Sequence, residues 1–170
     1  MKLGMVTYNM GKDMDVDRLI AFCTETGLEG VELRTTHAHG VELSLSSPER
    51  AQVRAQFADS PVTLWGLGST CAYHAADPAE LAHNSEETKA FVRLAADVGA
   101  KGVKVRPNGF QEEAGISKEA TLEQIGLAYR QCAGNRHPAA GALGQEDPGL
   151  EQRAQPQPEG QVEPPGAAKA

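Results

Sequence analysis

Apolar residues recur along the first 133 positions with two different periods. Short runs rich in Val, Leu and aromatic residues alternate with longer stretches in which apolar residues return every three or four positions. The short runs predict strands, and the longer stretches predict amphipathic helices. Four strand-then-helix units therefore follow one another, with predicted strands at 2–8, 30–34, 62–68 and 102–106.

End signals and apolar faces place the four predicted helices. Gly27 and Gly99 follow the first and third helices as stop signals, and Pro48 lies near the start of the second. Asn84 and Glu87 have the spacing of a capping box, which predicts that the third helix begins there. The apolar faces are Val16, Leu19, Ile20 and Cys23 in the first helix, Val53 and Phe57 in the second, Phe91, Leu94, Ala95 and Val98 in the third, and Leu122, Ile125 and Tyr129 in the fourth, at 117–132.

The spacing of the predicted strands indicates a parallel sheet. Their centres lie roughly 27 to 39 residues apart, enough for a strand and a crossover helix. A complete (β/α)₈ barrel needs about 250 residues, so the patterned region is long enough for about half of one. The expected fold class is α/β: a partial (β/α)₈ TIM barrel with four βα units and parallel strands.

Charged residues in the second and fourth predicted strands favour a barrel over an open sheet. Successive strand residues point to opposite faces, so Glu32 and Arg34 share one face of the second strand. Lys104 and Arg106 share one face of the fourth strand in the same way. Because charges are costly to bury beneath helices, these four side chains are expected to point into the middle of a barrel.

The layers of a barrel interior predict how these charges are arranged. Each layer is filled from alternate strands, so Glu32 and Lys104 are expected to share a layer and pair. Arg34 and Arg106 are expected one layer nearer the carboxyl ends of the strands, where ligands bind. Two cations there would suit a carboxylate, a phosphate or an anionic enediolate. The alternative is a buried salt-bridge network that only neutralises itself.

Other candidate site residues follow the predicted strands. Tyr8, at the end of the first strand, either contacts a sugar or is a half-buried rim aromatic. His37 and His39 form a His-x-His pair after the second strand, which suits some metal sites but also an exposed loop. His74 follows the third strand on the same side. Cys71 has the chemistry of a nucleophile, but no pattern pairs it with a base.

Composition narrows the classes of partner and compartment. The net charge of −7 argues against a nucleic-acid-binding surface, which is usually basic. Cys23, Cys71 and Cys132 share no CxxC spacing, which predicts a reduced, cytoplasmic protein without structural disulfides. No apolar run approaches 18 residues, so no membrane association is expected.

Residues 134–170 depart from the strand–helix pattern. They contain six Gly, six Pro, seven Ala and five Gln, but no aromatic residue. Such a segment buries too little apolar area to offset its ordering entropy, so a disordered tail is predicted. The domains expected are therefore 1–133, the partial barrel, and 134–170, a low-complexity tail. A truncated or frameshifted reading of a longer barrel gene would explain the change of composition.

The motifs of the first 133 residues resemble the xylose isomerase-like TIM-barrel superfamily of sugar phosphate isomerases and epimerases. The order MKLGMVTYNM, GLEGVELR, VTLWGLGS and LAADVGAKGVKV carries the resemblance, over the N-terminal half only. It implies a divalent metal (Mn, Mg, Zn or Co) in the full-length parent, with principal ligands on strands five to eight. No metal ligand or catalytic residue is assigned here. The predicted substrate-binding residues are Tyr8, Glu32, Arg34, His37, His39, His74, Lys104 and Arg106.

Three functions are consistent with these features of the sequence. The first is metal-dependent proton transfer next to the carbonyl of a sugar or sugar phosphate in the full-length parent, with this chain inactive alone. The second is a non-catalytic half-barrel that self-associates through its open sheet edges or pairs with a partner. The third is an endonuclease-like phosphoesterase of the same superfamily.

Overall fold

The computed structural model describes residues 2–107 and 109–134. Its strands form one parallel sheet in the order β1-β2-β3-β4, so each strand pairs with its neighbour in the sequence. The strands are β1 Gly4–Val6, β2 Gly30–Arg34, β3 Thr63–Gly68 and β4 Val103–Lys104. The helices are α1 Val16–Thr26, α2 Ser47–Ala58, α3 Pro78–Val98, the short 3₁₀ helix η1 Glu112–Ala114, and α4 Lys118–Ala133. The parallel α/β architecture predicted from the spacing is confirmed.

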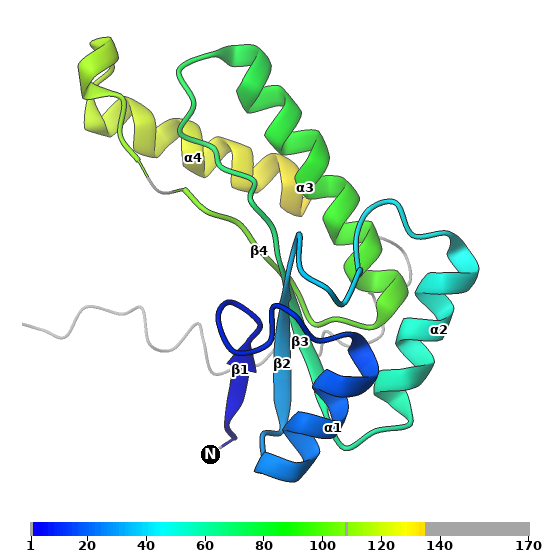
Figure 1. Ribbon diagram of the computed structural model, residues 1–170. Helices are drawn as coiled ribbons and strands as arrows, with labels where there is room; N and C mark the ends of the chain where they lie inside the picture. Colours follow the sequence, from blue (N-terminus) through cyan, green and yellow to red (C-terminus); the bar gives the residue numbers. More distant parts are fainter. Residues whose placement is uncertain (1, 108, 135–170) are drawn as a thin grey trace, which may run out of the picture.

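The helices lie along one face of the sheet (Figure 1). Helix α2 packs against α1 and α3, and α4 packs against α3 rather than over the other face. The core between strands and helices is apolar and buried, with Met5, Leu19, Val31, Leu33, Leu64, Leu67, Phe91 and Leu94 among its members. We call the opposite face of the sheet, which bears no helix among the described residues, the inner face.

Local signals explain where most helices begin and end. The Asp15 carboxylate accepts a hydrogen bond from the Arg18 N–H at 2.8 Å and caps α1. Gly27, with φ 74°, ends the helix in the left-handed conformation that glycine adopts without strain. Ser46 and Glu49 form a reciprocal capping box at the start of α2.

The predicted start of the third helix is wrong. Helix α3 begins at Pro78 and is capped by Asp77, whose side chain accepts from the Ala79 N–H. An Asp N-cap followed by Pro at the first helical position is a stronger start signal than the Asn84 and Glu87 spacing. Asn84 lies inside the helix, where its side-chain oxygen accepts from the Ala72 N–H at 3.3 Å.

The two outer strands are shorter than predicted. Strand β1 covers three residues instead of 2–8, and β4 covers two instead of 102–106. Among the described residues each has a ladder neighbour on one side only, so fewer hydrogen bonds extend the strand. The Arg106 N–H already donates to the Cys71 carbonyl beyond the end of β4, at 2.7 Å. Pro107 then has no N–H with which to continue a ladder.

The predicted apolar face of the fourth helix is wrong for two of its three residues, since only Ile125 is partly buried, against the cluster of Tyr73, Ala128 and Cys132. Leu122 and Tyr129 are exposed, whereas Thr121, Ala128 and Cys132 are buried. Helix α4 therefore turns the face that bears Thr121, Ala128 and Cys132 toward the molecule.

The described helices include none that is both long and apolar enough to cross a membrane. All three cysteines are free and buried. The tail predicted at 134–170 lies outside the described residues except for Gly134, which ends α4.

Candidate functional site

The inner face carries the charges that the strand pattern predicted. Val31 and Leu33 are buried in the core, so the intervening Glu32 and following Arg34 point to the other side of β2. Val6 of β1 is paired with Glu32 and lies on the same face. The alternation of faces predicted for the second strand is therefore confirmed.

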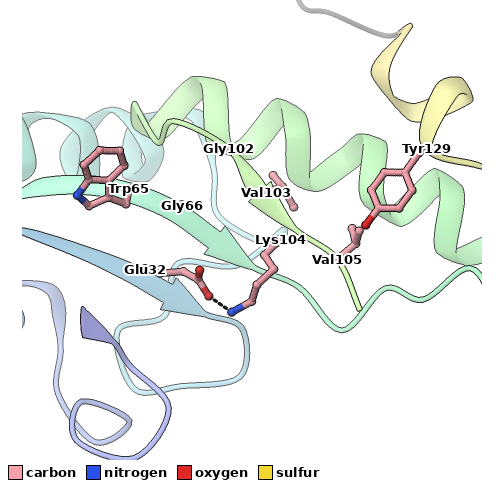
Figure 2. A pocket seen from close by; sticks show the side chains of 8 residues that line it. All are labelled: Glu32, Trp65, Gly66, Gly102, Val103, Lys104, Val105 and Tyr129. Atoms are coloured by element: carbon pink, nitrogen blue, oxygen red, sulfur yellow. Dashed lines mark hydrogen bonds and ion pairs between the residues drawn. The ribbon is translucent and has the colours of Figure 1, made fainter. Parts of the chain in front are cut away.

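Glu32 and Lys104 form an ion pair across the inner face (Figure 2). Their side chains are 22% and 50% exposed, so the pair is partly accessible to solvent. In the ladder, Glu32 is opposite Gly66, whereas Lys104 is opposite Gly68. This offset of two residues over two strands equals the stagger of about one residue per strand in a TIM barrel. The pairing expected from barrel layers is confirmed.

Glycines on β3 make room for this ion pair. A Cβ atom at Gly68 would lie 2.9 Å from Oε1 of Glu32. At Gly66 a Cβ atom would approach the Gly102 carbonyl oxygen to 3.2 Å. The carboxylate therefore occupies space that any other residue at position 68 would fill. The Gly-x-Gly spacing of Gly66 and Gly68 at the end of the predicted strand is the sequence signal for this space, and it was not among the predicted features.

A pocket of about 510 Å³ lies beside the ion pair (Figure 2). Trp65 lines it from β3 and Tyr129 from α4. The register between β2 and β3 shifts at Val31 and Glu32, which leaves Trp65 as an extra residue on β3. Its indole is 49% exposed on the inner face. The hydrophobic pattern does not identify Trp65 as a site residue, because a bulge leaves no signal in it.

Three of the predicted site residues meet where β1 and β2 end. The Arg34 guanidinium carbon lies 4.4 Å from the centre of the Tyr8 ring, a cation–π contact. The Thr7 hydroxyl accepts from the Arg34 N–H at 2.9 Å and is hydrogen-bonded to Nδ1 of His37 at 3.0 Å. Buried Thr7 thereby links Arg34 to His37. It was not among the predicted residues, although it precedes Tyr8 directly.

The turn between Arg34 and His37 has a strained backbone that is stabilised by hydrogen bonds to Glu42. Thr36 has φ 68°, which is unfavourable for a β-branched residue. The Glu42 carboxylate accepts from the Thr35 hydroxyl at 2.5 Å and from the Thr36 N–H at 2.6 Å. These charge-assisted bonds stabilise a conformation that Thr36 would otherwise avoid. Glu42 is a second supporting residue that the sequence analysis missed.

His39 is held differently from His37. Its Nδ1 accepts from the Val41 N–H at 3.0 Å, so its Nε2–H donates to the Arg34 carbonyl at 2.8 Å. The ring is buried, and both nitrogens are engaged by backbone groups. Burial lowers the pKa of His39, outweighing the hydrogen bond to Arg34 and the nearby Glu42 charge, which raise it. The neutral ring therefore positions the loop after β2.

We expect the stability of the protein to fall below about pH 6.5 because of His39. The ordinary histidine pKa is 6.5, and the folded value is lower. Well above pH 6.5, the His39 ring is neutral in both the folded and the unfolded protein. As the pH falls through this range, the unfolded chain binds a proton that the folded protein takes up only at lower pH. Urea unfolding at about pH 7 and pH 5 should show a smaller loss of stability for His39→Gln than for wild type.

The exposed His83 provides the control for this prediction. His83→Gln should retain the wild-type difference between the two pH values. An equal loss in wild type and His39→Gln would show that other groups cause the acid sensitivity.

The remaining predicted residues lie in other surroundings. His74 packs against Gly109, where an added Cβ would lie 2.9 Å from its ring. Its buried Nδ1 has no hydrogen-bond partner among the described residues. Arg106 follows the end of β4. Cys71 is fully buried, its Sγ donates to Glu87 at 3.3 Å, and burial raises the pKa of its thiol. A protonated, buried thiol is a poor nucleophile.

The family resemblance predicts a divalent metal, which would need several His, Cys, Asp or Glu side chains close together. Within residues 2–107 and 109–134, no group of three or more His, Cys, Asp or Glu side chains comes together as a metal ion would require. His39, one half of the His-x-His pair, has both nitrogens bonded to the backbone. The described residues therefore do not fit a metal site.

Solved structures resemble this fold, although no protein-family model matches the chain and no curated protein matches its sequence. The IolI protein with a bound zinc atom has a TM-score of 0.66 at 16% identity, over 82% of this chain and 49% of that one. D-psicose 3-epimerase, solved with D-fructose, has 0.63 at 15% identity, over 79% and 48%. A xylose isomerase homologue from Rhodospirillum rubrum has 0.61 at 13% identity, over 79% and 50%.

The chain thus spans about half the length of each of these solved structures. At such identities the likeness concerns the fold. It agrees with the four parallel βα units of this chain, half the number in a closed (β/α)₈ barrel.

Proposed function

We propose that this chain, whose fold is that of half a xylose isomerase-like TIM barrel, is the substrate-binding part of a sugar isomerase or epimerase. The observation that carries the proposal is the polar inner face at the carboxyl ends of the strands. Glu32 is paired there with Lys104, and Arg34 is stacked on Tyr8. Substrates of TIM-barrel enzymes bind at this end of the barrel.

These side chains have the chemistry that a sugar requires. The Glu32 carboxylate can accept from hydroxyl groups while Lys104 donates to them, and each already neutralises the other's charge. The flat Tyr8 ring suits the apolar face of a sugar. Arg34 presents a guanidinium fork that binds a phosphate or carboxylate in two places. We therefore include sugar phosphates among the substrates.

The reaction proposed is proton transfer next to the sugar carbonyl in the whole protein. Support comes from the fold, which is shared with a structure named D-psicose 3-epimerase and one named as a xylose isomerase homologue. This support is an analogy of fold. Because the described residues do not fit a metal site, their proposed part is to bind and orient the substrate. We expect the 170-residue chain alone to bind sugars without turning them over.

Sugar binding should depend on the ion pair of the inner face. Titration of the full chain with D-fructose, D-psicose and D-fructose 6-phosphate, followed by NMR, measures the affinity. Lys104→Met leaves the Glu32 carboxylate unpaired and removes a charged donor, so binding should weaken about tenfold or more. Lys2→Met is the matched control, since it breaks the solvent-exposed Lys2–Glu29 pair of 3.2 Å at the other end of the strands.

Two results would contradict the proposal. One is the same affinity in wild type, Lys104→Met and Lys2→Met. The other is the absence of binding for every ketose and ketose phosphate tested. Turnover by the chain alone would instead show that residues of this half complete the catalytic machinery.

A further inference from the structure

We propose that a second copy of this chain closes the two open edges of the sheet and forms an eight-stranded, two-fold symmetric barrel. The proposal concerns what covers the inner face, and it does not depend on the sugar chemistry suggested above. It rests on the order and parallel direction of the strands and on where exposed apolar side chains gather.

The described sheet has two free edges of complementary kind. Strand β1 pairs with β2 only, and β4 pairs with β3 only. Each edge therefore offers backbone N–H and C=O groups that have no ladder partner among the described residues. Because all strands are parallel, β1 of one copy can join β4 of another in the same direction as every other pair. Unprotected edges of this kind promote association.

Exposed apolar side chains gather along these edges and on the inner face between them. Leu3 lies just before β1, Val6 lies in β1, and Trp65 lies on the inner face. Tyr129 lies beside β4, where it lines the pocket shown in Figure 2. Trp65 and Tyr129 line the same pocket, and exposed apolar side chains that lie close together mark an interaction site. The exposed large apolar side chains are Leu3, Val6, Tyr8, Met10, Trp65, Phe110, Leu122, Leu127 and Tyr129.

Two copies of the described four-stranded sheet would supply the eight strands of a closed TIM barrel. A two-fold rotation places β1 of each copy beside β4 of the other. The ring then closes after two copies instead of growing into a filament.

The Glu32–Lys104 ion pair does not oppose the association of two copies. Glu32 and Lys104 neutralise each other within one copy, so two facing inner faces bring no uncompensated charge together at this pair. Val6 and Trp65 would move from water into the shared interior. Burying such apolar area is the main source of association free energy. A separate chain with a different sequence is the alternative occupant, and the test distinguishes it.

The test is the oligomeric state of purified full-length chain, by light scattering during size-exclusion chromatography. We expect a particle of twice the 18.0 kDa chain mass. Val6→Lys on the β1 edge and Tyr129→Glu on the other edge should each weaken dimerisation about tenfold or more, because each places a charge in both interfaces. Ala55→Lys, exposed on α2, is the control and should stay dimeric.

Mixing the two edge variants provides the sharper test. In a mixed dimer, one interface carries both substitutions and the other carries none, so dimers should return on mixing. If circular dichroism shows that Val6→Lys or Tyr129→Glu is unfolded, Val6→Ser and Tyr129→Ser replace them, since each still removes apolar contact area at the same edge. A monomer at all concentrations, a dimer unaffected by every edge variant, or the absence of rescue would overturn the proposal. A folded monomer would point to the separate chain as the occupant.

Discussion

Replacing Leu19 with alanine is expected to destabilise the protein by about 2–5 kcal/mol, the range for large-to-small substitutions in a core. Leu19 is completely buried where α1 packs on the sheet, within the cluster that includes Met5 and Val31. The loss combines transfer of the removed methyl groups with the cavity left behind. Urea unfolding measures it, with Leu127→Ala as the control. Leu127 is 47% exposed, and its truncation should change stability by about 0.5 kcal/mol or less.

A second substitution checks that the cavity is the cause. A Cβ atom at Gly11 would lie 2.8 Å from Cδ2 of Leu19 and 3.0 Å from Cε of Met5. Gly11→Ala should therefore destabilise the wild-type protein by overpacking, and should cost less when Leu19→Ala has made room. Strictly additive effects would show that the two sites do not share this space.

Replacing Gly30 with alanine is expected to expel the Trp65 side chain from its position over β2. The new Cβ would lie 2.0 Å from Cδ1 of Trp65 and 3.1 Å from the Thr63 carbonyl oxygen. The indole has to move, and the bulge that presents it has to readjust, at a cost of about 1–3 kcal/mol. Trp65 is the only tryptophan of the chain, so fluorescence emission reports its environment directly.

Gly102→Ala is the matched control for the change at Gly30. It lies just before β4, and its Cβ would have no atom within 4 Å. Its emission spectrum and unfolding curve should match those of wild type. An unchanged spectrum in Gly30→Ala would mean that the indole does not rest on that glycine in solution.

Much of the fold follows from local patterns in the sequence. The order of strands and helices, their parallel connection and the split of Val31 and Leu33 from Glu32 all depend on periodicity, which is a property of neighbouring residues. The same local reasoning failed at Asn84, because a nearby Asp-Pro pair was a stronger helix start. It also failed on α4, where Leu122 and Tyr129 looked like a core face but remain exposed.

The candidate site was predicted in part. Barrel layering brought Glu32 and Lys104 together correctly, because the stagger of a barrel is a general rule that needs no coordinates. Tyr8, Arg34 and His37 were placed near the same end of the sheet and do converge there. Thr7 and Glu42, which hold that group in place, were missed because their role lies in contacts with residues distant in the sequence.

The amino-acid pattern was sufficient to establish which segments are strands, which are helices, and which strand face bears charge. It did so because side-chain periodicity depends only on backbone geometry. Three features required the folded molecule: the bulge that exposes Trp65, the neutral ring of His39 and the length of the outer strands. Each depends on which groups approach from other strands and loops, and hydrogen bonds and burial between distant segments have no counterpart in a local pattern.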